Sequence, residues 1–125
     1  MVKVISLHFI LFTVLFSAKS QSVYKSYSKL VKKDLYTAQK GFDKKIKRYP
    51  AQSALGLSLC YTEPSYLNID SSMKYLLIAE DTWADVSEKS LSKLASFGIV
   101  KKSLERQKEI LGDLFYERCI LVNEP

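Results

Sequence analysis

The side chains that could support catalysis in this sequence are few and scattered. The only histidine is His8, in an N-terminal apolar stretch, so the rest of the chain has no Ser-His-Asp or Cys-His nucleophile system and no histidine metal site. Four glycines are too few for a Gly-rich phosphate loop. The nearest carboxylate pair is Glu63 with Asp70, which is more typical of a loop acid and a helix cap. We therefore predict a protein that is not an enzyme, with no catalytic residues, metal site or cofactor.

The two cysteines, Cys60 and Cys119, have two interpretations. A disulfide forms readily in an oxidising compartment. Both residues also occupy positions in helical stripes that suit a small apolar side chain, and free cysteine is among the most buried residue types. The sequence leaves both pairing and burial open.

The first twenty residues have the features of a secretory signal peptide. Lys3 precedes an apolar run over residues 4–16, and the small residues Ala18 and Ser20 stand before a predicted cut at Gln21. The run has 13 residues, whereas a membrane-spanning helix needs roughly 20, so cleavage is favoured over a retained anchor. We expect a signal peptide over residues 1–20 and a mature domain over residues 21–125.

The mature domain carries a mild excess of positive charge. Without Lys3 and Lys19 it has 17 basic and 13 acidic residues, a formal charge of +4. Lys40, Lys44 and Lys47 share a helical face opposite Phe42 and would suit an anionic membrane or glycan surface. The alternative is an ordinary solvated face. We expect no nucleic-acid partner for an exported protein.

The hydrophobic pattern predicts an all-α fold of about six helices and no strand. The expected helices cover residues 22–32, 35–49 and 51–61, then a stretch that starts at the cap Asp70 and reaches about residue 82, then residues 87–97, and a last helix from 99 or 100 onward. Asp34 and Asp70 are expected N-caps, Pro50 an expected helix end and Gly98 a left-handed stop. Trp83 is expected to be a core anchor. The last helix is expected to bury one stripe, made of Val100, Leu104, Leu111, Leu114, Phe115 and Cys119.

Two helical stretches repeat the same skeleton 34 residues apart, so that Ala38 corresponds to Ser72 and Phe42 to Leu76. A fixed period of this length is typical of helical-repeat arrays. The alternative is an unrelated secreted bundle of three hairpins with a chance repeat.

The run Lys-Asp-Leu-Tyr-Thr-Ala at residues 33–38, followed by Phe42 and Pro50, resembles the second half of a tetratricopeptide repeat (TPR). Together with the signal peptide and the run at residues 68–72, the chain resembles the N-terminal helical region of exported cell-envelope proteins of Gram-negative bacteria. The resemblance implies antiparallel hairpins stacked as a short TPR-like α-solenoid, with units at residues 22–50 and 51–83 and a degenerate unit at 87–121.

A repeat array of this kind binds partners in a concave groove lined by the first helix of each pair. By register, the candidate partner-binding residues are Tyr24, Tyr27, Gln52 and Thr62, with core packing as the alternative for Tyr27. We expect a non-enzymatic scaffold that binds an envelope or periplasmic protein. The alternative is a secreted bundle that binds an anionic membrane or glycan through Lys40, Lys44 and Lys47.

The last residues leave apolar surface near the end of the sequence, at Leu114, Phe115, Ile120, Leu121 and Val122. Solenoids need a polar terminal cap to stay soluble. This apolar surface could be covered in three ways: by the last helix folding back on its own bundle, by further repeats of a longer array, or by a partner.

Overall fold

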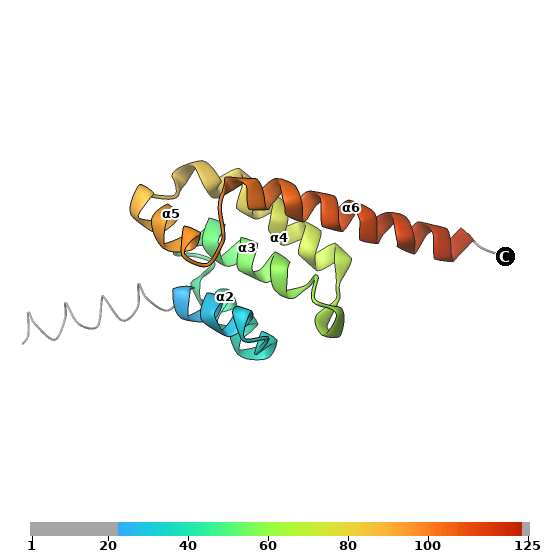
Figure 1. The fold of residues 1–125 in the computed structure, drawn as a ribbon, viewed down its shortest axis with the longest axis horizontal. Helices are drawn as coiled ribbons and strands as arrows, with labels where there is room; N and C mark the ends of the chain where they lie inside the picture. The colour runs from blue at the N-terminus through green and yellow to red at the C-terminus, as the bar shows by residue number, and fades with distance from the viewer. Residues whose placement is uncertain (1–22, 124–125) are drawn as a thin grey trace, which may run out of the picture.

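The computed structural model describes residues 23–123, and these residues form an all-α bundle without a strand (Figure 1). Its first helical residues are 23–31, here called the 23–31 helix. They are followed by α2 (Leu35–Lys45), α3 (Pro50–Cys60), η1 (Pro64–Tyr66), α4 (Ile69–Thr82), η2 (Trp83–Asp85), α5 (Glu88–Ala95) and α6 (Lys101–Asn123). The predicted all-α character and number of α-helices are confirmed for this part of the chain. None of the helices described is both long and apolar enough to span a bilayer.

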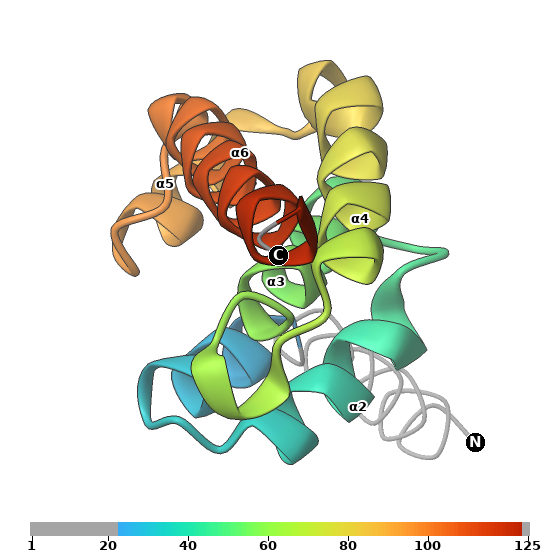
Figure 2. The same ribbon diagram turned by 90° about the vertical axis from the view of Figure 1, so that its right-hand side faces the viewer.

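The packing is centred on α3, which is buried almost all round. It packs against α2 on one side and α4 on the other, and α4 in turn packs against α6. Viewed along α6, the 23–31 helix and α2 lie at the bottom of the molecule, and α4, α5 and α6 lie above α3 (Figure 2). The 23–31 helix and α2 therefore lie together at one end of the bundle, where Phe97, in the turn after α5, also packs on the 23–31 helix.

The turn between the 23–31 helix and α2 forms as its residues predict. The Asp34 carboxylate accepts a hydrogen bond from the Thr37 backbone N–H at 3.4 Å and caps α2. Lys33 takes the left-handed conformation, φ 64°, which is uncommon for a residue other than glycine. The predicted N-cap at Asp34 is confirmed.

The predicted boundary between the second and third helices is wrong. Helix α2 ends at Lys45, and Pro50 is the first residue of α3 rather than the end of α2. Proline has no N–H and disfavours helical backbone in the preceding residue, so it suits the first turn of a helix. Tyr49 accordingly has a non-helical φ of −127°.

The close approach of α2 to α3 depends on Gly56. Phe42 is fully buried, and its ring lies where a side chain on Gly56 would stand, since a Cβ placed there would be 2.3 Å from the ring. On the other side of the ring, Tyr27 packs edge-on at 4.9 Å between centroids. At this position a residue without a side chain on α3 therefore admits α2.

The start of α4 differs from the prediction in its capping residue. Asn68, not Asp70, is the N-cap, and its side chain accepts a hydrogen bond from the Ser71 N–H at 3.0 Å. Asp70 lies in the first turn, where its charge favours the positive end of the helix dipole. The four residues that correspond across the 34-residue repeat, Ala38, Phe42, Ser72 and Leu76, are all fully buried.

Helices α5 and α6 are joined by a loop in which Gly98 has φ 79°, as predicted for a left-handed stop. Trp83 is buried, as expected of a core residue. The predicted stripe of α6 is only partly correct, because Leu104 and Leu111 are buried while Val100 and Phe115 are exposed, each at 48%. Leu114 and Cys119 are half-buried. The reason is that the second half of α6 extends past the other helices (Figure 1).

Candidate functional site

Two of the four predicted groove residues lie in the core. Tyr27 is 1% exposed and Gln52 is 5% exposed, and the Tyr27 hydroxyl donates a hydrogen bond of 2.5 Å to the Gln52 carbonyl. Burial raises the pKa of the Tyr27 phenol far above its ordinary value. Both residues are therefore buried rather than displayed on a groove, and Tyr27 has the packing role given above as its alternative.

The other two groove residues are half-buried and engaged within the chain. The Tyr24 ring stacks on Phe97 at 6.5 Å between centroids, and the Lys93 ammonium lies 5.1 Å from the Tyr24 centroid. Thr62 donates a hydrogen bond of 2.9 Å to the Leu59 carbonyl. Partner contact by Tyr24 and Thr62 remains a prediction, but the four residues do not form one open groove.

The predicted basic residues Lys40, Lys44 and Lys47 are exposed, but only Lys40 and Lys44 lie on α2, because the helix ends at Lys45 and Lys47 stands in the following turn. No ion pair among residues 23–123 involves any of the three. Tyr36 stands one turn before Lys40 on the same side, 64% exposed, with the Lys40 ammonium 5.4 Å from its ring centroid. A row of cations with an exposed aromatic ring is therefore available to an anionic surface.

In the described region, the carboxylates Glu63 and Asp70 are not assembled into a catalytic pair. Glu63 pairs with Lys33 at 2.5 Å, and Asp70 pairs with Arg118 at 3.5 Å, so each carboxylate has its own partner from a different helix or turn. Within the same residues, no group of three or more histidine, cysteine or acidic side chains is placed to hold a metal ion.

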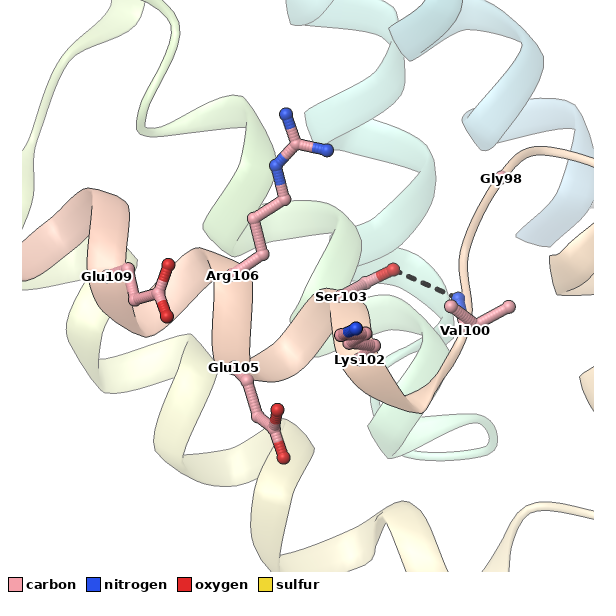
Figure 3. A pocket seen from close by; sticks show the side chains of 7 residues that line it. All are labelled: Gly98, Val100, Lys102, Ser103, Glu105, Arg106 and Glu109. Carbon is pink, nitrogen blue, oxygen red and sulfur yellow. Dashed lines mark hydrogen bonds between the residues drawn. The ribbon is translucent and has the colours of Figure 1, made fainter.

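An open pocket of about 470 Å³ lies beside the first turns of α6 (Figure 3). Its charged residues all come from that one helix: Lys102, Glu105, Arg106 and Glu109. Figure 3 shows Glu105 and Arg106 extending in opposite directions, while the Ser103 hydroxyl accepts a hydrogen bond from the Val100 N–H at 3.0 Å. The pocket therefore has no acid and base converging on a common point.

The cysteines are both free. Cys60 is fully buried, and burial, with a smaller contribution from Glu63 and Asp43, raises its thiol pKa to about 12. Cys119 is half-buried on the outer part of α6. Because the thiolate is the reactive form, the two thiols should differ strongly in reactivity.

We expect a maleimide reagent at mildly alkaline pH to label one thiol per folded molecule, at Cys119, and two thiols after unfolding in guanidinium without reductant. Peptide mass spectrometry locates the label, and Cys119→Ser is the control that should remove the native labelling. Failure to label either thiol in the unfolded chain would mean that the two cysteines are paired, against this structure.

Sequence reasoning missed two polar clusters. The Gln107 amide, 2% exposed, lies 3.2 Å from the Ser58 carbonyl and 3.1 Å from the Ser58 hydroxyl, so it ties α6 to α3. Gln107 stands between Leu104 and Leu111 on the buried stripe, which is the signal that could have identified it. In the second cluster, Gln39 on α2 bonds the hydroxyls of Tyr61 and Tyr66 at 3.1 and 2.6 Å.

Exposed apolar side chains gather on the outer part of α6. Five large side chains there are exposed, with Leu121 at 73% and Val122 at 77%; the five are Phe115, Tyr116, Ile120, Leu121 and Val122. The expected apolar surface near the end of the sequence is therefore present. In the described part of the chain, these residues lie where α6 extends past the other helices, rather than folded back on the bundle (Figure 1).

Comparison with protein-family models, with curated protein sequences and with solved structures found no match to this chain. The case for a function therefore rests on the residues of the chain itself.

Proposed function

We propose that the protein is an exported, non-enzymatic scaffold of the bacterial cell envelope that binds a protein partner through the outer part of α6. The observation that carries this proposal is the row of exposed apolar side chains from Phe115 to Val122. Exposed apolar surface of this kind marks interaction sites in soluble proteins. The partner surface is thus moved from the predicted groove to the projecting helix.

The outer part of α6 suits a partner that receives a helix. Its apolar residues are consecutive from Ile120 to Val122, so they point to different sides of the helix. A helix that is apolar on several sides is normally surrounded by protein. We therefore propose that a groove of the partner encloses this end, in the way that amphipathic helices dock into hydrophobic grooves.

Export and a TPR-like arrangement belong to the same proposal. Export is supported by the signal-peptide features of residues 1–20, which lie outside the described residues. The TPR-like arrangement is supported by the buried equivalents Ala38 with Ser72 and Phe42 with Leu76. It is also supported by α3 and α4, which run side by side in opposite directions (Figure 1). The proposed location is the periplasm or envelope of a Gram-negative bacterium.

Site-specific photocrosslinking in cells tests the partner surface. A photoreactive amino acid replaces Tyr116 or Leu121 on α6, and matched controls carry it at the exposed positions Asp81 and Lys89. We expect the α6 positions to give one discrete adduct with a second protein and the controls to give none.

Two results would contradict the proposal. Equal adducts from α6 and control positions would show that the outer part of α6 is not selective, and an adduct of twice the chain mass would show that a second copy covers it. The mass of the same purified protein reports on export, because a cut before Gln21 removes residues 1–20.

A further inference from the structure

We propose that the end of the molecule formed by the 23–31 helix and α2, here called the basic end (residues 23–48), binds the surface of an anionic phospholipid bilayer. This inference concerns a second surface and does not depend on a partner at α6.

The charge of the chain is strongly divided between the basic end and the residues that follow it. Residues 23–48 contain nine basic and two acidic side chains, a formal charge of +7. Residues 49–125 contain eight basic and eleven acidic side chains, a formal charge of −3. Because α2 packs on α3, and α3 separates it from α4, the positive part of the sequence is also one end of the fold (Figure 2). Such a division orients a protein in the field of a charged surface.

The cations at the centre of the basic end are not neutralised within the fold. Lys33, at the edge of the basic end, pairs with Glu63, and Lys108 on α6 pairs with Glu80 at 2.7 Å. Lys40 and Lys44 instead lie on the side of α2 opposite the buried Phe42 ring, Lys47 is exposed in the turn that follows the helix, and no ion pair of the described residues involves the three. They are therefore free to contact an external anion, and basic side chains near an anionic bilayer each strengthen binding by roughly fivefold.

Two exposed apolar side chains favour a bilayer over a soluble or polysaccharide anion. Tyr36 lies on the same face as the lysines, and Val31 ends the 23–31 helix, each 64% exposed. A tyrosine ring with a polar tip prefers the boundary between lipid headgroups and acyl chains. Binding to a hydrophilic polyanion would gain nothing from inserting Val31 or the Tyr36 ring, whereas a lipid surface accepts cations and apolar groups together.

The test is co-sedimentation of the exported protein with lipid vesicles. One set of vesicles is pure phosphatidylcholine, and the other contains equal parts of phosphatidylcholine and phosphatidylglycerol. The charge variant is Lys40→Gln with Lys44→Gln and Lys47→Gln. Its matched control is Lys89→Gln with Lys101→Gln and Lys102→Gln, which removes the same charge from exposed residues outside the basic end.

We expect the protein to bind only the anionic vesicles. The charge variant should lose affinity on the order of a hundredfold, and the control should lose much less. Tyr36→Ala should weaken binding several-fold. Arginine in place of Lys40, Lys44 and Lys47 should retain binding, and added salt should reduce it. Far-UV circular dichroism checks that each variant remains folded.

Three results would overturn the proposal. Equal losses in the two charge variants would show that only net charge matters. Binding to dextran sulfate but not to anionic vesicles would identify a glycan-type ligand instead. No binding to either would leave the basic end as a solvated surface. None of these results bears on α6, so this proposal and the proposed function can fail separately.

Discussion

Replacing Gly56 with alanine should lower the free energy of unfolding by about 1–3 kcal/mol, although alanine normally stabilises a helix relative to glycine. The added Cβ would lie 2.3 Å from the Phe42 ring. Phe42 is fully buried and held edge-on by Tyr27, so the ring cannot move without disturbing the packing of the 23–31 helix. Urea denaturation followed by circular dichroism measures the change.

Gly112→Ala is the matched control for this prediction. Gly112 also lies within a helix, α6, but a Cβ there would have no atom within 4 Å. Its replacement should raise the free energy of unfolding by about 0.5–1 kcal/mol. In the Gly56→Ala background, Phe42→Leu should cost less than it does alone, because the smaller side chain makes room for the Cβ. If both glycine variants were stabilised, the tight contact between α2 and α3 would be absent.

The second large effect is expected at Gln107. Gln107→Leu keeps a side chain of similar size but removes the amide that bonds Ser58 across the interface between α6 and α3. The buried Ser58 and Ser72 hydroxyls lose that partner but keep the hydrogen bonds between the two serines, so the free energy of unfolding should fall by about 0.5–1.5 kcal/mol. Urea denaturation again measures it.

Two comparisons separate the hydrogen bonds from simple packing. Arg106→Leu, at the exposed neighbouring position, should change stability by no more than about 0.5 kcal/mol. Ser58→Ala should destabilise, whereas Ser53→Ala should be neutral or stabilising, because the buried Ser53 hydroxyl has no partner among the described residues. Equal effects of the two serine changes would contradict the importance of the network.

Local sequence signals predicted the helices well where the relevant interactions are local. Asp34 and Gly98 act within a few residues of themselves, and both behave as predicted. Pro50 was misassigned because a proline between two helical patterns is compatible with the end of one or the start of the next. Asn68 and Asp70 are both good capping residues two positions apart, so propensity alone could not decide between them.

The candidate sites were harder to predict because they depend on how the third pair of helices packs. Tyr24 and Tyr27 would line an open groove only if α5 and its following turn lay elsewhere, but Phe97 packs against both rings. Gln107 has the helical position of a stripe residue, between Leu104 and Leu111, but a stripe defined by apolar side chains alone leaves a polar residue out. The exposure of Lys40 and Lys44 was predictable, since their position opposite Phe42 follows from the helical period alone, whereas Lys47 lies in the turn beyond α2.

The fluorescence of Trp83 reports on the detachment of α6 from the rest of the bundle. Trp83 is the only tryptophan in the chain and is 8% exposed. It lines two neighbouring cavities, of about 300 and 340 Å³, whose other walls include Leu104 and Lys101 of α6. Solvent entering as α6 lifts from α4 would shift its emission to longer wavelength while the other helices keep their ellipticity. Fluorescence and circular dichroism should therefore diverge wherever α6 detaches before the remaining bundle unfolds, and coincide if the bundle melts as one unit.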